Sequence, residues 1–288
     1  MDTAGRTAVI TGGGSGIGLG IAGAFLNAGM RVVLADLRQD HLDQAMAMLR
    51  GLGHSGRVHA IRVDVTDRGA MSAAAREAQQ LLGPIHVLVN NAGIGIEVPF
   101  AQAGFQDWDI GMGVNLGGVI NGLQTFLPAM LRRRDGGHVV NTASLAAFVT
   151  MPASMAIYAA SKAAVVALTE SIREELARDG IGVSLLCPGP VKSRINELAQ
   201  NVAHLEPSPA CLEAAKRLAS RAVSPLWMDP AQVGERVLSA VRNNEAYIIT
   251  HGEWREKIIA RLEAILEAMP HTADVRLSET LRAHQAQQ

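Results

Sequence analysis

Cysteine is scarce in this sequence, with only Cys187 and Cys211 among 288 residues. Two cysteines cannot build the disulfide framework of a small secreted domain, and neither belongs to a CxxC pair. The nine histidines are scattered, without the HExxH or HxxxH spacing that places two imidazoles on one metal ion. We therefore expect neither a structural disulfide nor a metal site built by the protein.

An excess of either charge is also missing, because 26 basic and 27 acidic residues leave a formal net charge of −1. Binding to nucleic acid draws on a basic surplus, so nucleic acid is not expected as the main partner. The one dense basic run, Arg132 to Arg134, follows an apolar stretch and is typical of a solvated helix end. No uninterrupted apolar run reaches the roughly 18 residues of a membrane span, and the N-terminus lacks a signal-peptide layout. These absences predict a soluble cytoplasmic protein without a membrane partner.

Hydrophobic residues, by contrast, make up 48% of the chain and gather in short runs rich in valine, isoleucine and leucine. Most of these runs are apolar throughout rather than alternating, as expected for strands that are covered on both faces. Segments with helical spacing separate them. This alternation predicts an α/β fold, a doubly wound parallel sheet of seven strands with helices on both faces. The expected strands are residues 7–11, 31–36, 57–64, 86–90, 137–142, 182–187 and 246–250.

The region from Lys192 to Pro230 interrupts this alternation, because it holds four prolines and no strand-like run. Long irregular segments in compact domains usually bind ligands or cover sites. We expect residues 1–250 to form one domain with a substrate lid at about residues 190–230. Residues 251–288 are expected to form a C-terminal helical extension packed on the same domain, since residues 254–269 carry apolar side chains at helical spacing.

The segment from Thr11 to Gly18 joins the first strand to the first helix and holds five glycines. Glycines let a pyrophosphate approach the backbone, and the free N–H groups of the helix start then bind it. Such turns also occur at ordinary strand–helix junctions, so the second strand is informative. It ends at Asp36, whose carboxylate can accept hydrogen bonds from the adenosine ribose and would repel the 2′-phosphate of NADP. Arg38 is near enough to neutralise that phosphate, but the pattern favours NAD.

Tyr158 and Lys162 stand four positions apart on a predicted helix and therefore share one face. A phenol with a pKa near 10 is a poor base at neutral pH, and a lysine cation beside it would favour the phenolate. A YxxxK spacing by itself is common among partly exposed residues. Its significance comes from three other segments, Asn90-Asn91-Ala92-Gly93 after the fourth strand, Ser144 after the fifth and Pro188-Gly189 after the sixth.

Together these motifs resemble the short-chain dehydrogenase/reductase superfamily, in its single-domain form that prefers NAD, over about residues 6–250. The resemblance implies a Rossmann-like fold and a catalytic tetrad of Asn115, Ser144, Tyr158 and Lys162. Tyr158 would be the general acid/base, Ser144 would hold the substrate oxygen, and Lys162 would lower the Tyr158 pKa and bind the nicotinamide ribose. Asn115 would support a water in the proton relay. The cofactor-binding residues that the resemblance implies are Gly12, Gly14, Ser15, Gly16, Ile17, Gly18, Asp36, Leu37, Asp64, Val65, Asn91, Ala92, Gly93, Tyr158, Lys162, Pro188, Gly189, Val191 and Ser193.

The resemblance also implies an NAD(P)-dependent oxidoreductase that interconverts a secondary alcohol and a ketone, as a homodimer or homotetramer. Apolar residues and methionines near the catalytic positions favour a bulky apolar or aromatic substrate. Segments 114–122 and 247–250 are similar to bacterial aryl-alcohol Cα-dehydrogenases of this superfamily. The loop between Ser144 and Tyr158 is one residue longer than is usual in the superfamily. The expected substrate contacts are Ser144, Leu145, Met151, Met155, Tyr158, Ile195, Leu198 and Trp227.

Two other interpretations stay open at this point. One is an NADPH-dependent carbonyl reductase in which Arg38 binds the 2′-phosphate. The other is a sensor that binds NAD without chemistry, although a non-catalytic scaffold has no need for Tyr158 and Lys162 together.

Overall fold

The computed structural model of the chain describes residues 1–195, 197, 205–220 and 223–270. In this part of the chain, one sheet of seven strands has the order β3-β2-β1-β4-β5-β6-β7, and every pairing in it is parallel. The strands are β1 Thr7–Thr11, β2 Arg31–Asp36, β3 Val58–Arg62, β4 Ile85–Asn90, β5 Gly137–Thr142, β6 Ile181–Cys187 and β7 Tyr247–Ile249. The predicted doubly wound fold is confirmed, and each predicted strand agrees with an observed one to within two residues at either end.

Helices connect the strands. The longer ones are α1 Gly16–Asn27, α2 Gln39–Gly51, α3 Arg68–Leu82, α4 Phe105–Met112, α5 Gly118–Arg133, α6 Ala156–Arg178, α8 Pro209–Ala219, α9 Pro230–Asn243 and α10 Arg255–Glu267. The short ones are the π-helical turn η2 Gly113–Gly117 and the 3₁₀ turns η1 Phe100–Gln102, η3 Leu145–Ala147, η4 Ala153–Met155 and η6 Gly252–Trp254.

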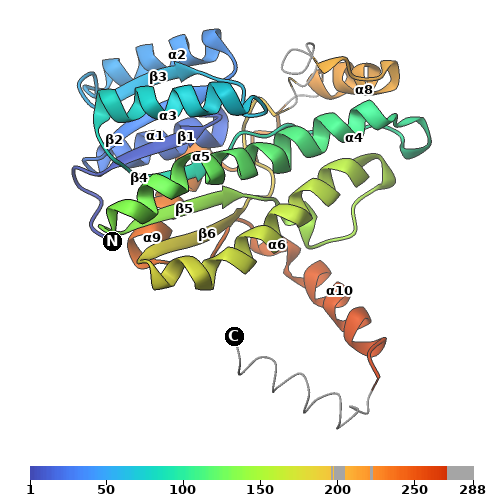
Figure 1. Ribbon diagram of the computed structural model, residues 1–288. Helices are drawn as coiled ribbons and strands as arrows, with labels where there is room; N and C mark the ends of the chain where they lie inside the picture. The colour runs from blue at the N-terminus through green and yellow to red at the C-terminus, as the bar shows by residue number, and fades with distance from the viewer. Residues whose placement is uncertain (196, 198–204, 221–222, 271–288) are drawn as a thin grey trace. The chain divides into compact units, whose positions relative to one another are not determined.

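Helices cover both faces of the sheet. In Figure 1, α3, α5 and α6 lie in front of the strands. On the other face α1, α2 and α9 share one hydrophobic core with the strands, and Ile21, Leu42 and Val237 are buried there. In the strand order, β2 and β3 lie on one side of β1, and β4 to β7 lie on the other side. The sheet therefore changes winding direction between β1 and β4. A crevice at the carboxyl ends of the strands is the usual binding place in such sheets.

The packing of α1 on α9 depends on two glycines. A Cβ placed on Gly20 would lie 2.1 Å from the carbonyl oxygen of Pro230. A Cβ on Gly234 would lie 2.2 Å from the carbonyl oxygen of Gly20. The two backbones therefore touch without an intervening side chain. This contact holds α1 in place, and the glycine-rich turn leads into the N-terminus of that helix.

The interval from Lys192 to Pro230, expected to be irregular, contains α8. Ser208 caps this helix by accepting a hydrogen bond from the backbone N–H of Cys211 at 3.1 Å, and Pro209 occupies the first helical turn. Proline fits that position because the first helical N–H groups have no partner within the helix. Two of the four prolines that suggested an irregular segment therefore start helices, Pro209 in α8 and Pro230 in α9.

One helical stretch, residues 153–178, is long and apolar enough to cross a membrane by length and composition, with a mean hydropathy of 1.3 over an 18-residue window. It contains no uninterrupted apolar run of that length, because polar residues such as Ser161 and Lys162 divide it. Its main part, α6, packs against β5 and β6, and it buries Val165 and Thr169. This packing is that of a helix covering the sheet.

By their internal contacts, residues 1–251 and residues 252–288 form two compact units. The first contains the sheet and helices α1 to α9. The second contains η6 and α10 in its described part. The packing of the C-terminal extension on the main domain stays a prediction.

Candidate active site

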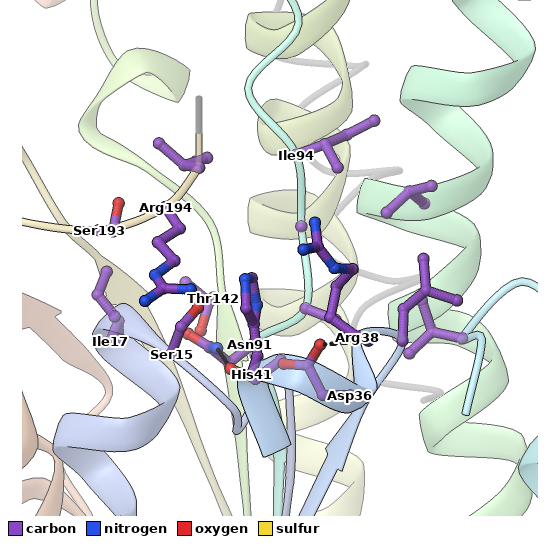
Figure 2. Close-up of a pocket in the computed structure, with 18 of the residues that line it drawn as sticks. Ser15, Ile17, Asp36, Arg38, His41, Asn91, Ile94, Thr142, Ser193 and Arg194 are labelled. Atoms are coloured by element: carbon purple, nitrogen blue, oxygen red, sulfur yellow. Dashed lines mark hydrogen bonds between the residues drawn. The ribbon is translucent and has the colours of Figure 1, made fainter. Parts of the chain in front are cut away.

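A pocket lies at the carboxyl ends of the central strands. Figure 2 shows side chains from separate chain segments pointing into it, Ser15 and Ile17 from one, Asp36 and His41 from another, and Ser193 and Arg194 from a third. Fifteen of the residues expected to bind the cofactor line it, namely Gly12, Ser15, Gly16, Ile17, Asp36, Leu37, Asp64, Val65, Asn91, Ala92, Gly93, Tyr158, Lys162, Pro188 and Ser193.

The glycine-rich turn between β1 and α1 is built for close backbone approach. Gly12 has a φ of +64°, in the left-handed region that favours glycine. A Cβ on Gly18 would lie 2.1 Å from the carbonyl oxygen of Gly12, so only glycine fits there. Ser15 precedes the first turn of α1, but its side chain makes no capping hydrogen bond. The N–H groups at this helix start are therefore available to an anion.

Asp36, at the end of β2, is held in a fixed position by two backbone groups. Its Oδ2 accepts a hydrogen bond from Gly14 N at 2.9 Å, and its Oδ1 accepts one from Arg38 N at 3.0 Å. The Arg38 guanidinium forms two hydrogen bonds with Asp40, at 2.8 and 2.6 Å. These bonds hold the pKa of Asp40 at about 2. The Arg38 guanidinium, next to the pocket, is thus paired with a carboxylate in the first turn of α2.

His41 is a pocket residue that the sequence reasoning did not find. It lies on α2, is 3% exposed, and places its Nε2 3.2 Å from Oε2 of Glu197. The same carboxylate lies 3.9 Å from Nη1 of Arg38. A single histidine among the apolar positions of a helix gives no signal that it faces a pocket.

The loop after β4 forms the back of the pocket, and Thr11 holds it against β1. The Thr11 hydroxyl accepts hydrogen bonds from the backbone N–H groups of Asn91 and Ala92, at 2.9 and 3.0 Å. The Asn91 side chain donates to the Thr11 carbonyl at 3.0 Å. On the opposite side of the pocket, Asn121 donates to the carbonyl oxygen of Val65 at 2.8 Å. Polar side chains thus fix the backbone on both sides.

Four of the expected cofactor contacts do not line the pocket. Gly14 and Gly18 support the turn from behind, and Gly189 N donates to the Thr250 hydroxyl at 3.0 Å. Val191 is buried in the core shared with α1 and α9, where it pairs with Met228 across an isolated parallel bridge. Val191 was expected to contact the cofactor, but it does not line the pocket.

The two residues of the YxxxK motif are both buried on α6. Lys162 is 3% exposed and Tyr158 is 9% exposed. Lys162 Nζ donates to the carbonyl oxygen of Thr142, at the end of β5, at 2.9 Å, and lies 6.0 Å from the centre of the Tyr158 ring. Ser144, two residues beyond β5, accepts a hydrogen bond from Ala146 N at 3.1 Å, and its hydroxyl is near enough to the Tyr158 hydroxyl to act on the Tyr158 pKa. Strand β5 and helix α6 therefore bring these groups together.

Asn115 lies in the π-helical turn η2 between α4 and α5. Its side chain forms two hydrogen bonds with the backbone of Ile94, at 2.9 and 3.1 Å, and one with the Ser161 hydroxyl at 3.0 Å. An ideal Cβ on Gly93 would lie 3.1 Å from Asn115 Oδ1 and 3.2 Å from Lys162 Nζ. Asn115 therefore joins the loop after β4 to α6, beside the lysine. Single π-turns inside helices often mark functional sites.

Burial controls the ionisation of the site. It raises the pKa of Tyr158, and the nearby Ser144 hydroxyl opposes that rise. Burial lowers the pKa of Lys162 to about 8, because a buried ammonium loses hydration. A lowered Tyr158 pKa was expected from the lysine, whereas desolvation has the larger effect in this structure. Burial also raises the pKa of Cys187, beneath Lys162, to about 12.

The space next to Tyr158 is apolar. Its buried cluster contains Ile94, Ile96, Val98, Ile110, Ala146, Ile157, Tyr158, Cys211 and Ala215. Partly buried side chains that pack on this cluster are Ala103, Trp108, Val114, Met151, Met155, Ile195, Leu205 and Ala210. Met151, Met155 and Ile195 were expected substrate contacts, whereas Trp108 and Val114 were not found from the sequence.

Two further expected substrate contacts, Leu145 and Trp227, do not line the pocket. Leu145 is 1% exposed, and its N–H donates to the Pro188 carbonyl at 3.1 Å. Trp227 lies in the turn before α9 and is neither in the apolar cluster nor in the pocket lining. Leu198 lies outside the described residues. Within the described ranges, no group of three or more His, Cys, Asp or Glu side chains could hold a metal ion.

The chain matches the short chain dehydrogenase family over residues 6–202. A C alpha-dehydrogenase of Sphingobium sp. (strain NBRC 103272 / SYK-6) is 35% identical over 266 residues, which cover 92% of this chain and 86% of that protein. The solved apo form of LigO from Sphingobium sp. strain SYK-6 is 39% identical, with a TM-score of 0.79 over 100% of this chain and 97% of that one. A short chain dehydrogenase/reductase from Burkholderia phymatum, solved in complex with NAD, is 34% identical, with a TM-score of 0.85 over 96% and 99%.

These similarities extend over the sheet, the glycine-rich turn and the Tyr158 site together. The family match and the relative solved with NAD support a nicotinamide cofactor and a small-molecule substrate. The family match and the full-length relatives agree on an oxidoreductase of the alcohol dehydrogenase type. The chain belongs to the short-chain dehydrogenase/reductase superfamily.

Proposed function

We propose that the protein oxidises a secondary alcohol to a ketone with NAD, and that the carbinol carbon of its substrate bears a bulky apolar or aromatic group. The observation that carries this proposal is the buried Tyr158 hydroxyl. The Ser144 hydroxyl lies near enough to act on its pKa, and apolar side chains pack around the Tyr158 ring. A phenol in this position can exchange a proton with a hydroxyl group while the apolar walls receive the rest of the substrate.

In the proposed reaction Tyr158 accepts the hydroxyl proton of the alcohol. Ser144 holds the same oxygen by a hydrogen bond and so keeps it within reach of the phenol. A bound nicotinamide cofactor supplies the acceptor for the hydride that leaves the carbinol carbon. Positioned acid–base groups of this kind typically contribute about 10² to 10⁴ to the rate.

Lys162 and Asn115 support the proton transfer in this proposal. The lysine ammonium, held by the Thr142 carbonyl, favours the phenolate by its charge and contacts the nicotinamide ribose. Its pKa of about 8 means that the charge weakens as the pH rises through that value. The side-chain amide oxygen of Asn115 lies beside Lys162. There Asn115 supports a water that passes the proton toward solvent.

The chain's own residues fit the proposed cofactor. The open glycine cradle and the free start of α1 suit a pyrophosphate. Asp36 suits the ribose hydroxyls, since both of its oxygens are already oriented by backbone donors. The NADPH alternative requires Arg38 to leave Asp40, and the bidentate pair opposes this.

Fluorescence titration with NADH and NADPH tests the cofactor proposal. The wild-type protein should bind NADH more tightly, and Asp36→Ala should reduce that preference because the carboxylate no longer repels a 2′-phosphate. Tighter NADPH binding by the wild type would contradict the proposal and favour the carbonyl reductase. The matched control is Asp43→Ala, which removes an exposed carboxylate on α2 outside the pocket lining.

Initial rates of NADH formation test the substrate proposal. With NAD, 1-phenylpropan-1-ol should be oxidised faster than lactate, since the walls around Tyr158 are apolar. A higher kcat/KM for lactate would contradict the aromatic substrate. Cofactor binding without turnover of any secondary alcohol would favour the sensor. The similarity to a C alpha-dehydrogenase supports aryl alcohols as the first compounds to assay. The cytoplasmic location and the homo-oligomeric state stay predictions.

A further inference from the structure

Asp107 is a fully buried carboxylate, 0% exposed, outside the tetrad and the cofactor pocket. Its Oδ2 accepts a hydrogen bond from Gly104 N at 2.9 Å, at the start of α4. Its Oδ1 accepts one from Ser208 N at 2.9 Å, at the start of α8. One carboxylate therefore binds the N-terminal ends of two helices that lie far apart in the sequence. Burying a charge is costly unless hydrogen bonds replace its hydration, and both oxygens have such a bond.

The α8 side of this junction carries further contacts. Ser208 Oγ accepts a hydrogen bond from Cys211 N at 3.1 Å and so caps α8. The Cys211 thiol is 0% exposed and lies near enough to Asp107 for the carboxylate to act on its pKa. Burial and the neighbouring carboxylate raise the pKa of Cys211 to about 12, so the thiol keeps its proton. A negative charge is also favourable at a helix N-terminus, because of the helix dipole.

The two joined helices both contribute side chains to the apolar cluster that contains Tyr158. From α4, Ile110 is buried in that cluster and Trp108 packs against it. From α8, Cys211 and Ala215 are buried in the same cluster. Figure 1 shows α8 beside α4, above the end of the sheet. The packing of this cluster around Tyr158 therefore depends on how firmly α8 is held to α4.

We propose that Asp107 is a positioning residue for substrate binding, which fixes α8 against α4 and so sets the width of the substrate pocket. This inference rests on the proposed oxidation of a bulky secondary alcohol. The cofactor pocket uses α1, β2 and the loop after β4, none of which Asp107 contacts through its hydrogen bonds. Loss of the junction should therefore weaken binding of the substrate and leave binding of the cofactor unchanged.

Asp107→Asn tests this role with little change of shape. An asparagine keeps one acceptor oxygen, whereas its NH₂ group would face the second backbone N–H, so one helix loses its partner. We expect the KM for 1-phenylpropan-1-ol to rise roughly tenfold, as is typical for loss of a hydrogen bond to a charged group. The kcat and the Kd for NADH should each stay within about twofold, which corresponds to less than the weakest typical hydrogen bond. The matched control is Asp109→Asn, which changes an exposed carboxylate on the same helix and should leave all three constants unchanged.

Hydrogen–deuterium exchange gives a measurement that does not depend on turnover. In Asp107→Asn the amides of α8 should exchange faster, while those of α1 keep their wild-type rates. Ser208→Ala removes the α8 cap and leaves the α4 bond in place, so it should change α8 exchange and KM in the same direction by less.

Asp107→Asn would overturn the inference if α8 exchange were unchanged, or if α8 exchange increased while KM stayed at the wild-type value. A proportional loss of kcat and NADH binding would also overturn it. Absence of alcohol oxidation by the wild type would instead refute the proposed function, with the exchange result still reporting on the junction.

Discussion

Gly20→Ala is a direct test of the backbone contact between α1 and α9. The added methyl carbon would lie 2.1 Å from the Pro230 carbonyl oxygen and 2.4 Å from its carbon. Close carbon–oxygen contacts in proteins lie at about 3.3 Å or more. One of the two helices therefore has to move by about 1 Å, and its core side chains have to move with it.

The magnitude follows from two opposing effects. Inserting a methyl group into a tightly packed core typically costs about 1–3 kcal/mol, and a backbone oxygen as the obstacle favours the upper part of that range. Alanine gains up to about 1 kcal/mol over glycine in helix propensity. We expect a net loss of about 2 kcal/mol in the free energy of unfolding. For a chain of this size that lowers Tm by about 4–8 °C.

Thermal unfolding followed by circular dichroism measures the effect, with Gly23→Ala as the control. Gly23 lies on the same helix, but a Cβ there meets nothing within 4 Å. That variant should keep or raise the wild-type Tm, because it gains helix propensity without a clash. A Tm of Gly20→Ala equal to or above that of Gly23→Ala would refute the reasoning.

Two further predictions concern a buried histidine and the glycine-rich turn. Burial and the charge of Arg173 lower the pKa of His138 to about 3, against about 6.5 in the unfolded chain. The unfolded state therefore binds a proton that the folded state does not, so stability falls as the pH drops from 6.5 toward 3. Urea unfolding measures the free energy of unfolding at pH 7.5 and pH 5. The decrease between these two pH values should be about 2 kcal/mol smaller in His138→Gln than in the wild type. An equal decrease would contradict the lowered pKa of His138. Gly12→Ala should weaken NADH binding at least about tenfold, since a non-glycine residue at that φ is strained by about 1–3 kcal/mol and its Cβ would lie 2.9 Å from the Ala92 Cα. Gly56→Ala, in open space, is the control in the same fluorescence titration, and an unchanged Kd in Gly12→Ala would argue against the turn as the pyrophosphate site.

The strands and the catalytic cluster were predictable because local patterns determine them. Strands buried on both faces are continuous apolar runs, and β1, β2 and β5 begin and end where those runs do. A parallel sheet brings the carboxyl ends of its strands to one edge, so residues that follow neighbouring strands meet there. Ala143 after β5 and the loop after β4 line the same pocket for this reason.

Features that depend on tertiary contacts were not predictable from such patterns. The π-turn at Asn115 arises because its side chain bonds to Ile94 and Ser161, both distant in the sequence. Asp107 reads as an ordinary first-turn acid of α4, and only the fold brings Ser208 to its second oxygen. The Tyr158 pKa depends on burial, which a motif does not encode. Val191, a cofactor contact implied by the family resemblance, is buried in the core shared with α1 and α9, and neither it nor Trp227 lines the pocket.

The most direct test of the proposed chemistry is the rate of NADH formation from a secondary aryl alcohol by wild type and Tyr158→Phe, with NADH binding measured on the same samples. Phenylalanine keeps the ring within its apolar cluster and removes only the hydroxyl that exchanges the proton. We predict a rate at least about 10² lower with an unchanged Kd for NADH. A variant that binds NADH normally and retains a rate close to that of the wild type would contradict the assignment of Tyr158 as the general base.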